Sequence, residues 1–84
     1  MAASAQYTIT TTPQKIVSAS IHDQTIKIHT SQIIYLGTDS SVSTSTGYRM
    51  DVGDKTEFQL DGNTELWAVT NSGSGLIYTF TFIS

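Results

Sequence analysis

The stretch IIYLGTDSSVSTSTGYRMDVGD, residues 33–54, contains the pattern on which the fold depends. A strand-like segment that ends at Gly37 gives way to a Ser/Thr tract, and strand-like character returns at Tyr48. The tract contains one apolar residue, Val42. We interpret residues 38–46 as an ordered surface loop that Val42 anchors to the fold, and not as a linker between two domains.

Outward from this stretch, apolar and polar residues alternate with a period of two, and no window shows the apolar period of an amphipathic helix. The alternation predicts eight short strands, separated by turns rich in Gly, Asp, Asn and Ser. The sequence therefore predicts an all-β protein with no helix: one antiparallel, jelly-roll-like β-sandwich that occupies residues 1–84 as a single domain. The expected strands are 6–12, 16–21, 25–30, 33–36, 48–52, 56–60, 65–70 and 76–83.

A change of sheet or a bulge is expected near Ser31, because the adjacent Ile33 and Ile34 break the strict alternation. In segment 25–30, Ile26 and Ile28 are expected to face inward and Lys27 and His29 outward.

The chain is short for a domain that has no disulfide bond. With 84 residues and no cysteine, it has no disulfide to supplement a small hydrophobic core. Self-association or docking on a larger body is therefore the expected source of additional stability.

Charge and hydropathy exclude two classes of partner from the prediction. The net charge is −3 and only four residues are basic, which is not the footprint of a nucleic-acid-binding protein. There is no basic and apolar leader at the N-terminus and no apolar run of the roughly 20 residues that span a bilayer. We expect a protein that is made in a cytoplasm and binds neither nucleic acid nor membrane.

The residue inventory offers no catalytic constellation. The two histidines, His22 and His29, lie in no nucleophile or metal motif. Five of the seven acidic residues fall within fifteen positions, but their spacing follows no calcium-loop pattern and suits turns and strand edges; they are Asp51, Asp54, Glu57, Asp61 and Glu65. The sequence predicts a protein that is not an enzyme, with no catalytic residues, no metal site and no cofactor.

Two segments look apolar on both faces, which is more than a strand of a sandwich needs. In 65–70, Trp67 faces away from Leu66; it is expected either beneath the N-terminal segment or in an intermolecular contact. In 76–83, one face carries Leu76, Tyr78, Phe80 and Phe82, with Ile77 and Ile83 on the other. A terminal strand could also pair with a neighbour's open edge. The predicted interface residues are Tyr7, Ile9, Trp67, Ile77 and Ile83.

Half of the chain resembles small virion structural proteins of tailed bacteriophages. The resemblance rests on Tyr35-Leu36-Gly37, Val42, Gly47-Tyr48 with Met50, Val52-Gly53-Asp54 leading to Phe58-Gln59-Leu60, and Leu66-Trp67-Ala68-Val69. They are similar to a pattern of the form YLG, V, GxxL, xGE, LxAV, with Met50 and Asp54 in place of Leu and Glu.

This resemblance implies a capsid decoration or cement protein that binds the outside of the phage head and stabilises it. Its partners would be the major capsid protein or other virion proteins, and it would form a homo-oligomer, with a trimer favoured. It would be located in the virion, after assembly in the host cytoplasm.

The alternative is a carbohydrate-binding module or a host-adhesion component of a tail or fibre. Small β-sandwiches bind sugars through exposed aromatic rings beside polar groups. Trp67, Tyr35, Tyr48 and Tyr78 could supply the rings, and Asp39 or Asn71 the hydrogen bonds.

Overall fold

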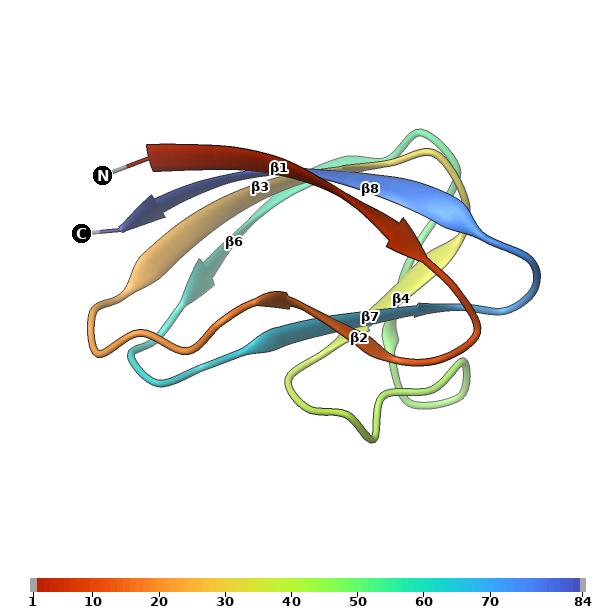
Figure 1. Ribbon diagram of the computed structural model, residues 1–84, viewed down its shortest axis with the longest axis horizontal. Helices are drawn as coiled ribbons and strands as arrows, with labels where there is room; N and C mark the ends of the chain where they lie inside the picture. The colour runs from red at the N-terminus through yellow and green to blue at the C-terminus, as the bar shows by residue number, and fades with distance from the viewer. Residues whose placement is uncertain (1, 84) are drawn as a thin grey trace.

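Eight strands build two antiparallel sheets in the computed structural model, which describes residues 2–83 (Figure 1). In chain order the strands are β1 (Ala2–Ile9), β2 (Gln14–Val17), β3 (Gln24–Thr30), β4 (Ile34–Gly37), β5 (Tyr48–Met50), β6 (Lys55–Leu60), β7 (Leu66–Thr70) and β8 (Gly75–Ile83). Sheet A has the order β1-β8-β3-β6 and sheet B the order β2-β7-β4-β5. The predicted all-β sandwich is confirmed, and residues 2–83 contain no helix.

The strand order is that of a jelly roll. The first strand pairs with the last, the second with the seventh, the third with the sixth and the fourth with the fifth. The chain is therefore one long hairpin that is rolled so that alternate strand pairs lie in opposite sheets. The Ser/Thr loop between β4 and β5 is the tip of that hairpin.

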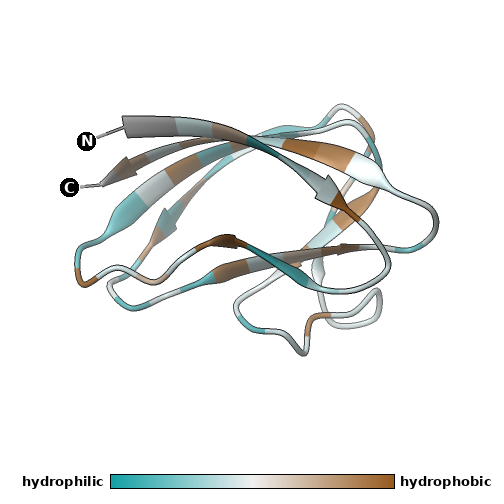
Figure 2. Ribbon diagram, viewed as in Figure 1, coloured by the Kyte–Doolittle hydropathy of each residue, from teal (hydrophilic) through white to brown (hydrophobic). Residues whose placement is uncertain are grey.

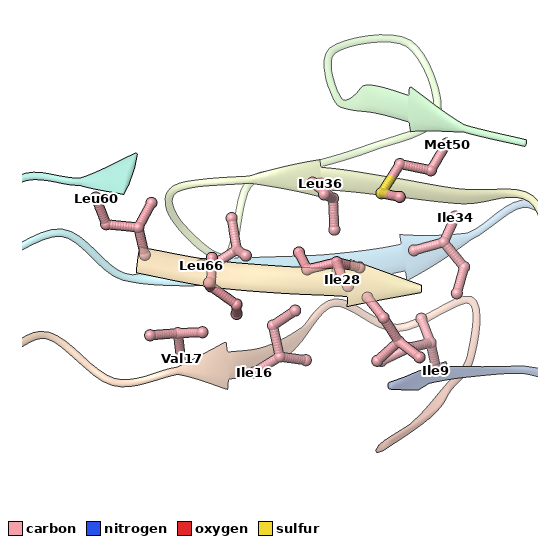
Figure 3. Packing of buried hydrophobic residues seen from close by; sticks show 12 residues of the cluster. Ile9, Ile16, Val17, Ile28, Ile34, Leu36, Met50, Leu60 and Leu66 are labelled. Carbon is pink, nitrogen blue, oxygen red and sulfur yellow. The ribbon is translucent and has the colours of Figure 1, made fainter. Parts of the chain in front are cut away.

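The core fills the space between the sheets with aliphatic side chains. Figure 2 shows hydrophobic residues interspersed with hydrophilic ones along the strands. Figure 3 shows the inward residues of both layers meeting, among them Ile9, Ile28, Ile34, Leu36 and Leu66. As predicted, Ile26 and Ile28 are buried, whereas Lys27 is exposed and His29 is partly exposed.

The change of sheet expected near Ser31 is confirmed, because β3 belongs to sheet A and β4 to sheet B. Thr30, the last residue of β3, links this connection to the β5–β6 connection, which also passes from one sheet to the other, by hydrogen bonds. Its N–H donates to the Asp54 carbonyl (3.1 Å), its carbonyl accepts from Gly53 N–H (2.9 Å), and its hydroxyl donates to the Asp51 carbonyl (2.9 Å).

The first two strands differ most from the prediction, whereas the boundaries of the other six agree within two residues. The first strand lies earlier than expected and ends at Ile9, whereas the prediction extended it to residue 12, just before Pro13. The second was predicted to reach Ile21 but ends at Val17, after a bulge between Lys15 and Val17. Ile21 lies in the following turn and is 80% exposed, because the alternating pattern continues past the last ladder pair.

Candidate interaction surface

The outer faces of the two sheets differ in what covers them. On sheet B, the loop at the hairpin tip folds back over β4. A methyl group added at Gly37 would lie 2.7 Å from Cβ of Val42, and one added at Gly47 would lie 2.7 Å from Cβ of Tyr35. Val42 is the loop's only buried side chain between residues 38 and 46. Sheet B is therefore partly covered by the chain itself.

Trp67 lies half-buried on the same outer face of sheet B, opposite Lys15 and Gly37 in the two neighbouring strands. Its indole Nε1 donates a hydrogen bond of 3.0 Å to Oε1 of Glu65. This bond is the main reason why the pKa of Glu65 is lowered, with a smaller contribution from Lys15, whose Nζ lies 3.4 Å from Oε2. The N-terminal strand β1 belongs to sheet A, so it does not cover Trp67.

On sheet A, the outer face of the central strand β8 presents a row of large apolar side chains, which we call the β8 strip. Phe80 is 43% exposed and Leu76 is 36% exposed, whereas Tyr78 and Phe82 are partly buried. The rings of Phe80 and Phe82 lie 4.6 Å apart between centroids, and those of His29 and Tyr78 lie 5.5 Å apart. Figure 1 shows no connecting segment of residues 2–83 across this side of the sheet. The strip consists of Leu76, Tyr78, Phe80 and Phe82.

Polar side chains border the β8 strip on both sides. On β1, Ser4, Gln6 and Thr8 lie opposite Phe80, Tyr78 and Leu76 in the ladder. On β3, Thr25, Lys27 and His29 lie opposite Phe82, Phe80 and Tyr78, and β6 adds Lys55, Glu57 and Gln59. An apolar centre with a polar rim is the usual composition of a protein-binding surface.

An open hollow of about 470 Å³ lies on this face, lined by Lys27, His29, Lys55, Tyr78 and Phe80 among others. Lys27 lies 4.0 Å from Glu57, and no ion pair within residues 2–83 includes Lys55. The hollow therefore combines aromatic walls with a positively charged border.

The predicted interface residues fall in different places. Ile9 and Ile77 are fully buried between the sheets, which corrects their assignment: they pack the core of the chain and have no surface to offer a partner. Tyr7 is partly buried and packs against the core from β1. Trp67 is half-buried, as described, and the side chain of Ile83 lies outside the described part of the structure.

The β8 strip is the feature that the sequence interpretation passed over. The sequence predicts its four members on one face, as the structure has them, but selects Ile77 on the opposite face as an interface residue. The ladder reverses this assignment, because Tyr78 and Phe80 lie beside the outward His29 and Lys27 of β3. The outward polar residues of β3 indicate which face of β8 is exposed, but only when the pairing register of β3 and β8 is known.

The acidic residues serve turns and ion pairs. Arg49 Nε donates to Asp51 (2.8 Å), which raises the pKa of Arg49, and Asp54 accepts from the Asp51 N–H (2.8 Å). The described residues contain no group of three or more His, Asp or Glu side chains placed to hold a metal ion. They also contain no helix long and apolar enough to cross a membrane.

Comparison with known proteins gives no relative: no family model, no curated protein and no solved structure matches the chain.

Proposed function

We propose that the protein is a non-enzymatic structural component of a bacteriophage particle, a decoration or cement protein that binds the outside of the head through the outer face of sheet A. The observation that carries this proposal is the β8 strip, which leaves Phe80 43% exposed at the centre of a sheet. The motif resemblance supports the type of particle, and the surface supports docking on a protein.

The composition of this face suits a protein partner. Aromatic side chains at the centre of a patch contribute most to binding when they are fully desolvated, and a surrounding polar rim excludes water. Strand β8 carries no charged side chain, so burying it against a capsid surface costs little electrostatic desolvation. A modest contact in each copy is sufficient where many copies act on one shell.

Shells that lack the protein provide the direct test. Wild-type protein is expected to co-sediment with them, and Phe80→Ser is expected to weaken binding by at least about fivefold, because loss of a central aromatic contact costs more than about 1 kcal/mol. Ile21→Ser is the matched control, since Ile21 is apolar, 80% exposed and located in a turn away from the strip. Circular dichroism of each variant reports the fold.

Equal binding by wild type and Phe80→Ser would contradict docking through this face. Failure of the wild type to bind any shell would contradict the decoration role itself.

The second candidate is carbohydrate binding, which the hollow on the same face favours. Tyr78 and Phe80 offer ring faces for stacking on a sugar, and Lys27 and Lys55 at the border suit an acidic sugar. Jelly rolls host both viral capsid and lectin domains, so the fold supports neither candidate over the other. Two results together would favour this candidate over the first. Wild-type protein would fail to bind the shells, and it would bind a glycan array in a way that Phe80→Ser abolishes.

A further inference from the structure

Four strands form the borders of the two sheets, and each border presents unpaired backbone N–H and C=O groups. Such edges invite pairing with another chain unless the edge strand is short, charged, bulged or interrupted by proline. The four edges of this protein differ sharply in these features.

Three of the edges are protected. β2 has four residues, follows Pro13, contains Lys15 and is bulged; β5 has three residues, including Arg49. β6 alternates charged Lys55 and Glu57 along its outer face. Each therefore carries at least one of the features that discourage pairing with a second chain.

The fourth edge, β1, has none of them. It is eight residues long, AASAQYTI, with no charged residue and no proline. Its ladder with β8 runs without a shift from Ala2 opposite Phe82 to Ile9 opposite Gly75, so it is free of bulges. In an antiparallel ladder the backbone groups of alternate residues point away from the partner strand. About four residues of β1 therefore present N–H and C=O groups along an open border.

We propose that β1 pairs antiparallel with β1 of a second copy across a two-fold axis, which joins the two A sheets into one continuous eight-stranded sheet. This interface lies at the edge of sheet A and does not depend on what the β8 strip binds. An uncharged strand that meets its own copy brings no like charges together. That matters in a chain of net charge −3, and β8, the next strand in, is uncharged as well.

The pairing has a consequence for the outer face of sheet A. A two-fold axis perpendicular to the sheet keeps both β8 strips on the same side, separated by the two β1 strands. With strands about 4.8 Å apart, the strips would lie roughly 14 Å from one another. The dimer would thus present two parallel apolar strips to one partner surface. A two-fold interface of this kind gives a dimer and not the trimer that the family resemblance favours.

Sedimentation velocity and amide hydrogen exchange test the pairing on the wild-type protein. The expected result is a dimer, with exchange in residues 2–9 that slows as protein concentration rises, because the outward N–H groups become bonded. A monomer at all concentrations, a trimer, or a dimer whose exchange in residues 2–9 is independent of concentration would overturn the proposal.

A matched pair of substitutions locates the interface. Gln6→Lys adds an exposed charge on the outer face of β1. In the register that places Gln6 opposite its own copy, two like charges meet across the two-fold axis, and dimer dissociation is expected to increase about two- to fivefold. Gln59→Lys makes the same change on the exposed outer face of β6, the opposite edge of sheet A, and should leave the dimer intact. The reverse pattern would overturn the assignment to β1. Monomeric protein that still bound shells through Phe80 would overturn the edge pairing alone.

Discussion

Val42 shows how much one side chain contributes to an otherwise polar loop. It is buried at 7% exposure and fills space that two glycines, Gly37 and Gly47, leave open. Replacing it by alanine removes two methyl groups, which corresponds to about 1.5 kcal/mol of lost burial. We expect Val42→Ala to accelerate hydrogen exchange in residues 38–46 while the strands keep their protection.

The control for that experiment is Val52→Ala, at a position that is 61% exposed in the turn before β6. It should leave exchange in residues 38–46 unchanged. Unchanged exchange in Val42→Ala itself would show that the loop is held by its hydroxyl and backbone hydrogen bonds instead.

Glu65 is expected to make the stability of the fold depend on pH. Its pKa is lowered below the ordinary value of 4.5, chiefly by the hydrogen bond from Trp67. A lowered pKa in the folded state stabilises the fold above pH 4.5, and this contribution is lost as the pH falls through the folded-state pKa. Thermal unfolding should show wild type more stable than Glu65→Gln near about pH 7, with the difference closing as the pH falls below 4.5 and through the lowered folded-state pKa.

Glu57→Gln is the comparison for this titration, because Glu57 lies 4.0 Å from Lys27 and bonds no indole. A difference between wild type and Glu65→Gln that stayed constant with pH would contradict the proposed role of the charge.

At the scale of elements, Thr30 indicates why the two sheets stay joined at one end. Its hydroxyl is fully buried and donates to the Asp51 carbonyl. Valine has the same shape but no donor, so Thr30→Val removes one of the two hydrogen bonds that the Asp51 carbonyl accepts, the other coming from the Asp54 N–H (3.1 Å), at a cost of about 0.5 to 1.5 kcal/mol. Urea denaturation should show this loss. Thr25→Val, on the outer face of the same strand, should be close to neutral, and equal effects of the two variants would contradict the account.

The eight strands were predictable from sequence because each one is a short alternating run bounded by turn residues. The orientation of β8 was not, since both of its faces are apolar and a shift of one residue exchanges them. Ile77 and Phe80 are nearly equal in hydrophobicity, so their environments depend on which residues of β3 lie beside them. For the same reason the candidate surface on sheet A could be identified only from the strand pairing. Val42, in contrast, could be predicted from sequence, because it is the one apolar residue in a Ser/Thr tract.

At the scale of the whole molecule, the sandwich was predictable but the pairing of its strands was not. Periodicity reports which residues face a core, and in a chain with eight similar strands many pairings would satisfy it. The order β1-β8-β3-β6 brings together segments from opposite ends of the sequence. No local signal in the residues of β1 and β8 records that they are neighbours.

This nested strand pairing also favours a particular order of folding events. The β4–β5 pair closes over a ten-residue loop, residues 38–47, whereas Ala2 has to find Phe82 across almost the whole chain. Each doubling of a loop adds about 0.6 kcal/mol of closure entropy, so the outermost pair costs about 2 kcal/mol more to close than the innermost one. Folding is expected to proceed from the hairpin tip outward, with β1 joining last. Until β1 has paired, the edge of β8 is open. At high protein concentration this edge can pair with β1 of a neighbouring molecule before β1 of the same chain reaches it.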